Sequence, residues 1–88
     1  MELDQMDFSD ADLTDARLIG ADLSYSNLSN SILNGADMSN AFMERTNLKG
    51  ATFDSGTTWP NWRNSINITC PDGYNSDNIS FCGFYSAT

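Results

Sequence analysis

The stretch ADLTDARLIGADLSYSNL, residues 11–28, repeats a five-residue pattern in which a bulky apolar residue follows a small residue at a distance of two. The pattern extends outward in both directions along the chain. Its central place holds only Leu, Phe or Met, at Leu3, Phe8, Leu13, Leu18, Leu23, Leu28, Leu33, Met38, Met43, Leu48 and Phe53. The place two residues earlier is small at Ala11, Ala16, Ala21, Ser26, Ser31, Ala36, Ala41, Thr46 and Ala51.

A period of five fits neither an α-helix nor a continuous β-strand. Around a helix the apolar stripe would drift, and along a strand it would alternate between opposite faces. A chain that turns a corner every five residues places the small and the bulky residue of each pentad on its inner face. Polar residues and Gly20, Gly35 and Gly50 then fall at the corners, where turns favour them.

The pentads resemble the A(D/N)LXX motif of the pentapeptide-repeat family, most clearly at residues 11–15, 21–25 and 36–40. The resemblance covers residues 1–55 and implies an all-β fold, a right-handed, four-sided β-helix with four pentads in each coil. Eleven pentads make about 2.75 coils. Residues 20 apart should then stack, so the central residues would form four inner columns that make the hydrophobic core. Tyr25 and Arg45 share one outward place and should form a cation–π pair.

The repeat ends after Ser55, and we expect residues 56–88 to form an irregular capping tail. Trp59 and Trp62 are candidates to cover the open end of the core, and a carbohydrate-binding platform is the alternative. Free thiols at Cys70 and Cys82 would be exposed in this polar segment, so we favour a disulfide and an oxidising compartment. The sequence CPDGYNSD, residues 70–77, is also similar to a Cys-bearing tail of exported bacterial members of the family.

Two features of the repeat region suggest contacts with other molecules. Phe42 occupies an outward place where Asp or Asn is usual, so it is a candidate contact with a partner or with the tail. Met1 and Met6 occupy inner places that favour small residues, in a first coil with no capping helix before it. An uncapped end would expose unpaired strand groups. Truncation, a poor cap and end-to-end assembly all remain open as explanations.

Composition argues against several classes of function. The chain has 88 residues, a net charge of −8 and no histidine, which disfavours nucleic-acid binding and general-base or zinc chemistry. No phosphate loop or activated nucleophile is present, so we expect no enzyme, no cofactor and no metal site. The early acids form a solvated surface more readily than a calcium site. Asn27, Asn67 and Asn78 begin N-x-Ser/Thr sequons, which are potential glycosylation sites.

These observations lead to a non-enzymatic, exported structural or protein-interaction module, with a protein partner and no membrane span. The expected location is extracellular or periplasmic, although Met1 leads directly into acidic residues and not into a signal peptide. The alternative is a subunit that self-assembles through the β-helix ends into a fibre. A third hypothesis follows from the family resemblance, an acidic DNA mimic that binds a topoisomerase; fewer than three coils would make it short for that role.

Overall fold

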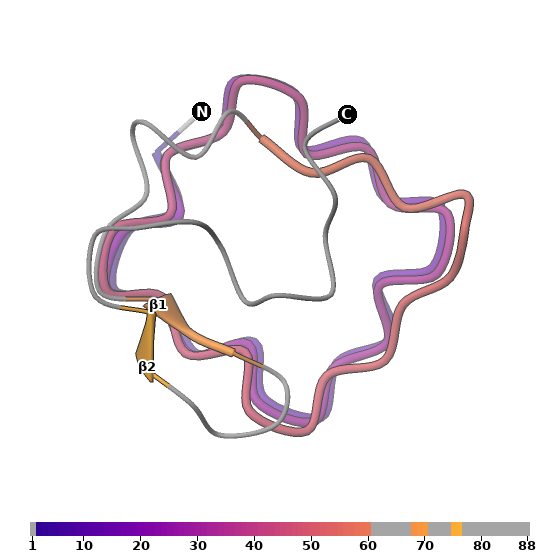
Figure 1. Ribbon diagram of the computed structural model, residues 1–88. Helices are drawn as coiled ribbons and strands as arrows, with labels where there is room; N and C mark the ends of the chain where they lie inside the picture. The colour runs from indigo at the N-terminus through magenta and orange to yellow at the C-terminus, as the bar shows by residue number, and fades with distance from the viewer. Residues whose placement is uncertain (1, 61–67, 71–74, 77–88) are drawn as a thin grey trace.

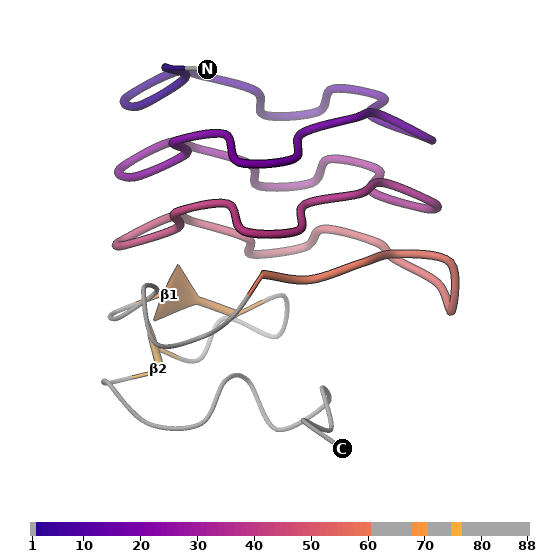
Figure 2. The same cartoon turned by 90° about the horizontal axis from the view of Figure 1, so that it is seen from above.

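The structure is a computed structural model that describes residues 2–60, 68–70 and 75–76. The chain winds into a four-sided coil whose successive turns lie one on another (Figures 1 and 2). We refer to residues 2–20, 21–40 and 41–60 as the first, second and third coils. Seven parallel bridges join residues 20 apart: Glu2–Asp22, Asp7–Asn27, Asp12–Ile32, Arg17–Asp37, Asp22–Phe42, Asn27–Asn47 and Ile32–Thr52. One coil therefore takes four pentads.

Backbone hydrogen bonds between coils follow one repeating scheme. The N–H of Phe8, a central residue, donates to the C=O of Asn27 at 2.7 Å, and the N–H of Asn27 donates back to the C=O of Met6 at 2.8 Å. The same pair of bonds recurs around the coil. Because each side is only about three residues long between corners, the ladders consist of isolated bridges and not of long strands.

Each corner up to Gly50 is a tight turn with one residue in the left-handed region. The turn at Leu23 is typical: the N–H of Ser26 donates to the C=O of Leu23 at 3.1 Å, and Tyr25 has φ +63°. This combination defines a type II turn, which requires a positive φ at its third residue. Glycine fills only three of these places, and the others are Gln5, Asp10, Asp15, Tyr25, Asn30, Asn40 and Arg45.

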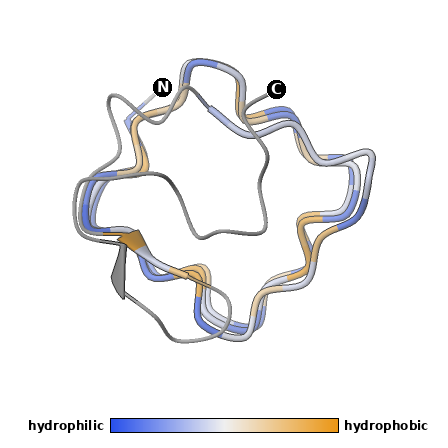
Figure 3. Ribbon diagram, in the orientation of Figure 1, coloured by the Kyte–Doolittle hydropathy of each residue, from blue (hydrophilic) through white to orange (hydrophobic). Residues whose placement is uncertain are grey.

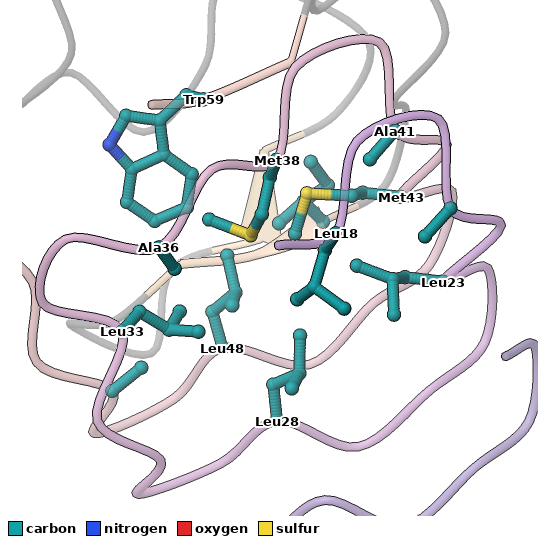
Figure 4. Close-up of a cluster of buried hydrophobic side chains, with 13 residues drawn as sticks. Leu18, Leu23, Leu28, Leu33, Ala36, Met38, Ala41, Met43, Leu48 and Trp59 are labelled. Carbon is teal, nitrogen blue, oxygen red and sulfur yellow. The ribbon is translucent and has the colours of Figure 1, made fainter. Parts of the chain in front are cut away.

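The core lies inside the coil, and the second coil is its best-buried level. Hydropathy in Figure 3 alternates accordingly, with hydrophilic residues on the projecting corners. Figure 4 shows the buried side chains, and those of Leu23, Leu28, Leu33, Met38, Met43 and Leu48 are completely buried. In the first coil Leu3, Phe8 and Leu13 are only partly buried, Leu18 is 9% exposed and Met6 is 46% exposed. Phe53 is also partly buried.

The coil continues beyond residue 55, the predicted end of the repeat region. The next bridge joins Asp37 to Thr58, which is 21 residues later, so one extra residue has entered the third coil. Trp59 consequently follows Leu18 and Met38 in one inner column, where the residue is 8% exposed and its side chain lies beside Met38 (Figure 4). It meets Phe53 edge to face, with ring centroids 5.5 Å apart.

A further bridge joins Asn47 to Thr69, which lies in β1 (Ile68–Thr69). The N–H of Leu48 donates to the C=O of Thr69 at 2.8 Å, and the N–H of Thr69 donates to the C=O of Thr46 at 2.9 Å. Ile68 and Cys70 are buried on either side of Thr69. β1 also pairs antiparallel with β2 (Asn75–Ser76), with Ile68 opposite Ser76. Residues 68–70 therefore add a rung to the coil.

Candidate interaction surface

In six pentads, the outward-pointing residue at the second place stabilises the adjoining corner. There the side-chain Oδ1 of Asp or Asn accepts the backbone N–H two residues later, at 3.0–3.1 Å, and so pins the start of the corner. The six are Asp7, Asp12, Asp22, Asn27, Asp37 and Asn47. This Asx turn is a local alternative to backbone pairing, and it explains why the motif favours Asp and Asn at this place.

The hydrogen bonds also keep the carboxylates ionised. Side-chain and backbone hydrogen bonds from Ser9 lower the pKa of Asp7, and those from Thr14 lower the pKa of Asp12. Ser24 lowers the pKa of Asp22 and Ser39 that of Asp37 in the same way. Donation to the charged form stabilises it. The surface therefore stays negatively charged into the acidic range.

Phe42 departs from this scheme. It stands in the same place as the six, and among residues 2–60 no side chain accepts the N–H of Glu44, two residues further on. Phe42 itself is 46% exposed. Arg17, Ile32 and Thr52 also lack the Asx side chain, but among them only Ile32 is a large exposed hydrophobic residue, at 39%. Phe42 thus gives up a local hydrogen bond and leaves a large apolar residue exposed to water.

The surroundings of Phe42 are acidic. Its bridge partner is Asp22, which in turn bridges Glu2, so two carboxylates stack directly along the same side of the coil. At the adjoining corner the Arg45 guanidinium lies over the Tyr25 ring, 6.0 Å from its centroid, which confirms the expected cation–π pair. We call Glu2, Asp22, Tyr25, Phe42 and Arg45 the Phe42 side. Ile32 lies two pentads further round the second coil than Asp22, hence on the opposite side.

The structure places the remaining predicted residues as follows. Cys70 is 1% exposed at an inner place of the added rung, so the expectation that its thiol would be exposed is wrong. Cys82 lies outside the described residues, so the pairing of the two cysteines remains a prediction. Trp62, Asn67 and Asn78 also lie outside them. Asn27 is partly buried, and its Oδ1 accepts the N–H of Ser29, the Ser of its own sequon.

Sequence reasoning missed the rung at residues 68–70. Its signal was the short alternation of Ile68, Thr69 and Cys70, in which an apolar residue, a polar residue and an apolar residue follow one another. The bulky residue stands in the place that pentads give to a small one, and Cys70 stands in the central place. Because the bulky and the small residue have exchanged places, the five-residue pattern does not identify this rung.

The described part of the chain lacks two kinds of feature, a cluster of metal ligands and a membrane-spanning helix. Among its His, Cys, Asp and Glu side chains, no group of three or more is arranged to hold a metal ion. No helix long and apolar enough to cross a membrane occurs in this part of the chain.

A family model described as pentapeptide repeats matches residues 2–30 and 11–50 in eight copies, and the chain belongs to this family. Membership implies a right-handed β-helix. The family consists generally of non-enzymatic structural and interaction modules. A search of curated proteins gave no match.

Several solved structures of pentapeptide-repeat proteins are similar to the chain. Rfr23 from the cyanobacterium Cyanothece 51142 is 34% identical over 66% of this chain and 46% of its own, with a TM-score of 0.45. AT2G44920 from the Arabidopsis thaliana thylakoid lumen is 32% identical over 80% and 53%, with a TM-score of 0.46. HetL from Nostoc sp. strain PCC 7120 is 23% identical over 84% and 42%, with a TM-score of 0.42. The chain spans about half the length of these proteins.

Proposed function

We propose that the chain is an exported, non-enzymatic protein-interaction module whose binding surface is the Phe42 side. The observation that carries this proposal is the exposure of Phe42, an aromatic residue, at a place where six other pentads use Asp or Asn to close the corner. A residue that breaks the local rule of a repeat without a compensating contact is a candidate for function. Export is supported by the two cysteines, which favour an oxidising compartment.

The chemistry of the Phe42 side defines the partner. An exposed aromatic ring offers an apolar anchor, and exposed aromatic side chains are enriched at protein interfaces. Glu2 and Asp22 stack beside it, and hydrogen bonds from Ser24 hold the pKa of Asp22 below its ordinary value. Arg45, the base at this corner, already lies over Tyr25. The matching partner segment therefore has an apolar side chain flanked by Lys or Arg.

The test uses short peptides as the probe, with Leu or Trp flanked either by Arg or by Glu, and follows the backbone resonances of the protein by NMR. We expect the Arg-flanked peptide to shift resonances around Phe42 and Asp22, with an effect that weakens as salt rises. Phe42→Asn should abolish these shifts. Ile32→Asn is the matched control, since Ile32 occupies the same pentad place on the opposite side. Shifts that centre elsewhere, or that survive Phe42→Asn, contradict the proposal.

Self-assembly through the coil ends is the second candidate, and the first coil favours it. In the second coil the N–H groups of Asn27, Ile32 and Asp37 donate to the preceding coil. Among the described residues, the equivalent N–H groups of Asp7, Asp12 and Arg17 have no such acceptor, and in this candidate the last coil of another copy supplies it.

Charge limits how copies could join at that edge. Six acids and no base lie between Glu2 and Asp15, so two first coils facing each other would repel. Assembly would have to run head to tail. Light scattering on the protein under non-reducing conditions tests this candidate: particles far larger than the 9.7 kDa chain support it, and a monomer contradicts it.

A further inference from the structure

The corner between Leu33 and Ala36 contains Asn34–Gly35, the one Asn-Gly pair of the sequence. In such a pair the backbone nitrogen of the glycine attacks the side-chain amide carbon of the asparagine. A bond forms between Gly35 N and Asn34 Cγ, the amide group leaves as ammonia with the proton of the Gly35 N–H, and a succinimide ring results. Water then opens the ring to Asp or to isoaspartate. We propose that this corner is a latent self-modification site, and that Asp54 holds it closed.

The acceptor of the Gly35 N–H is unusual for this fold. At six other corners the N–H of the equivalent residue donates to a backbone C=O in the following coil, as from Asp15 to Asn34 at 2.9 Å and from Asn30 to Lys49 at 2.8 Å. Gly35 instead donates to the side-chain Oδ1 of Asp54 at 3.0 Å. The attacking nitrogen is therefore held by a carboxylate and not by the backbone.

The extra residue of the third coil explains this exchange. The coil pairing changes from 20 to 21 residues between Ile32–Thr52 and Asp37–Thr58, so the insertion falls at the corner that stacks on Gly35. Gly56 lies against Gly35 there, and its own N–H donates to the same Asp54 Oδ1 at 3.0 Å. Asp54 thus closes both corners at once. Its side chain takes the role that a backbone carbonyl has elsewhere.

A carboxylate in this position opposes the reaction in two ways. It holds the Gly35 N–H in a hydrogen bond that attack on Asn34 would have to break, and its negative charge disfavours loss of the amide proton, which attack by nitrogen requires. The product is opposed as well. Asn34 Oδ1 is buried without a hydrogen-bond partner among the described residues. A carboxylate formed at residue 34 would therefore have a buried oxygen with no hydrogen-bond donor, which is unfavourable.

Modification would alter the fold at this point. The N–H of Ala36 donates to the C=O of Leu33 across the corner at 3.0 Å, and Gly35 has φ +73°. Isoaspartate lengthens the main chain by one carbon inside this turn and adds a negative charge near Asp54. The modified corner should therefore lose the Gly35–Asp54 bond, and the side of the coil that carries Thr57 and Trp59 should loosen.

The experiment incubates folded protein in mildly alkaline buffer and follows residue 34 by mass spectrometry of proteolytic fragments, with isoaspartate detected by enzymatic methylation. The samples are wild type, Asp54→Asn, Asp54→Ala and wild type unfolded in urea. We expect Asp54→Ala to react about tenfold faster than the folded wild type, the scale of losing a charge-assisted hydrogen bond. Asp54→Asn keeps an acceptor without the charge and should fall between the two.

Asn47→Ala is the matched control, because Asn47 makes the equivalent Asx bond to the N–H of Lys49 at 3.0 Å, away from residue 34. Amide exchange at Gly35 gives an independent readout and should accelerate in Asp54→Ala only. Equal acceleration in Asn47→Ala would show general loosening and overturn the proposal. So would an unchanged or slower reaction in Asp54→Ala. If Asp54→Ala fails to fold, the reaction rate of Asp54→Asn is compared with wild type and Asn47→Ala in the same way.

Discussion

Asp15 and Gly35 lie one on the other at the same corner of successive coils, and a Cβ placed on residue 35 would overlap Oδ1 of Asp15. Asn30 and Gly50 repeat the relationship at another corner. Gly20 also has a positive φ, +70°, but nothing lies within 4 Å of its Cβ direction. At these two corners, the glycine of one coil therefore leaves room for the Asp or Asn side chain of the preceding coil.

This stacking predicts different results for two glycine substitutions. Gly20→Ala should lower the free energy of unfolding by about 1–2 kcal/mol, the penalty of the left-handed region alone. Gly35→Ala should lower it further, because the Cβ also displaces Asp15. Adding Asp15→Gly should remove this additional loss, because it removes the Oδ1 that the Cβ meets. Glycine is also compatible with the φ of +61° at residue 15. Urea unfolding of the variants measures this, and equal values for Gly20→Ala and Gly35→Ala would contradict it.

At two of the small inner places, a hydroxyl group joins successive coils. Thr46 Oγ1 donates to the C=O of Leu23 in the preceding coil at 2.8 Å, and Ser26 makes the same bond to Leu3 at 2.6 Å. Thr46→Val keeps the shape and removes the bond, so it should lower the free energy of unfolding by about 1 kcal/mol. Thr52→Val, at an exposed outward place, is the control. No difference between the two variants in urea unfolding would contradict the assignment.

Leu28 is fully buried in the inner column that also holds Phe8 and Leu48. Leu28→Ala should lower the free energy of unfolding by about 2–5 kcal/mol, and Leu28→Asp should unfold the protein. Ile32→Ala, at an outward place with 39% exposure, should change it by less than about 1 kcal/mol. Circular dichroism during urea titration measures all three. A folded, stable Leu28→Asp protein would rule out the inner column.

The lowered pKa values of Asp7, Asp12, Asp22 and Asp37 predict a dependence on pH. A carboxyl group whose pKa is lower in the folded state adds stability that is complete above the unfolded pKa, about 3.9, and is lost as pH falls through the folded value. The melting temperature should therefore decrease as the pH is lowered below about 4. Changing the four to Asn should flatten this fall, since Asn27 and Asn47 accept the same bond. An unchanged pH profile would contradict the Asx account.

The repeat region could be predicted from sequence because each pentad carries its own signal. The columns of Leu, Phe and Met define the inner face, and the Tyr25–Arg45 contact follows from a separation of 20 residues. The departure of Phe42 was visible for the same reason. A strict period makes a single exception detectable without any structure.

The rest depends on contacts that no local pattern encodes. One inserted residue shifts Trp59 into the inner column of Met38, and Asp54 replaces a backbone carbonyl at the resulting corner. The rung at Ile68–Cys70 follows a stretch without the repeat, and it is fixed by pairing with Thr46 and Leu48. Such long-range pairing depends on the exposed edge of the third coil and not on the β-propensity of three residues.

The central claim is that coils of four pentads stack in sequence and that residues 68–70 extend this stack. Amide hydrogen exchange measured by NMR tests it most directly. The N–H groups of Leu48 and Thr69 form the two bonds between the third coil and the added rung, at 2.8 and 2.9 Å, so both should exchange slowly, as should that of Ile32. The N–H of Asp12, one coil before Ile32, should exchange fast. Fast exchange at Leu48 and Thr69 would contradict the stacked rung.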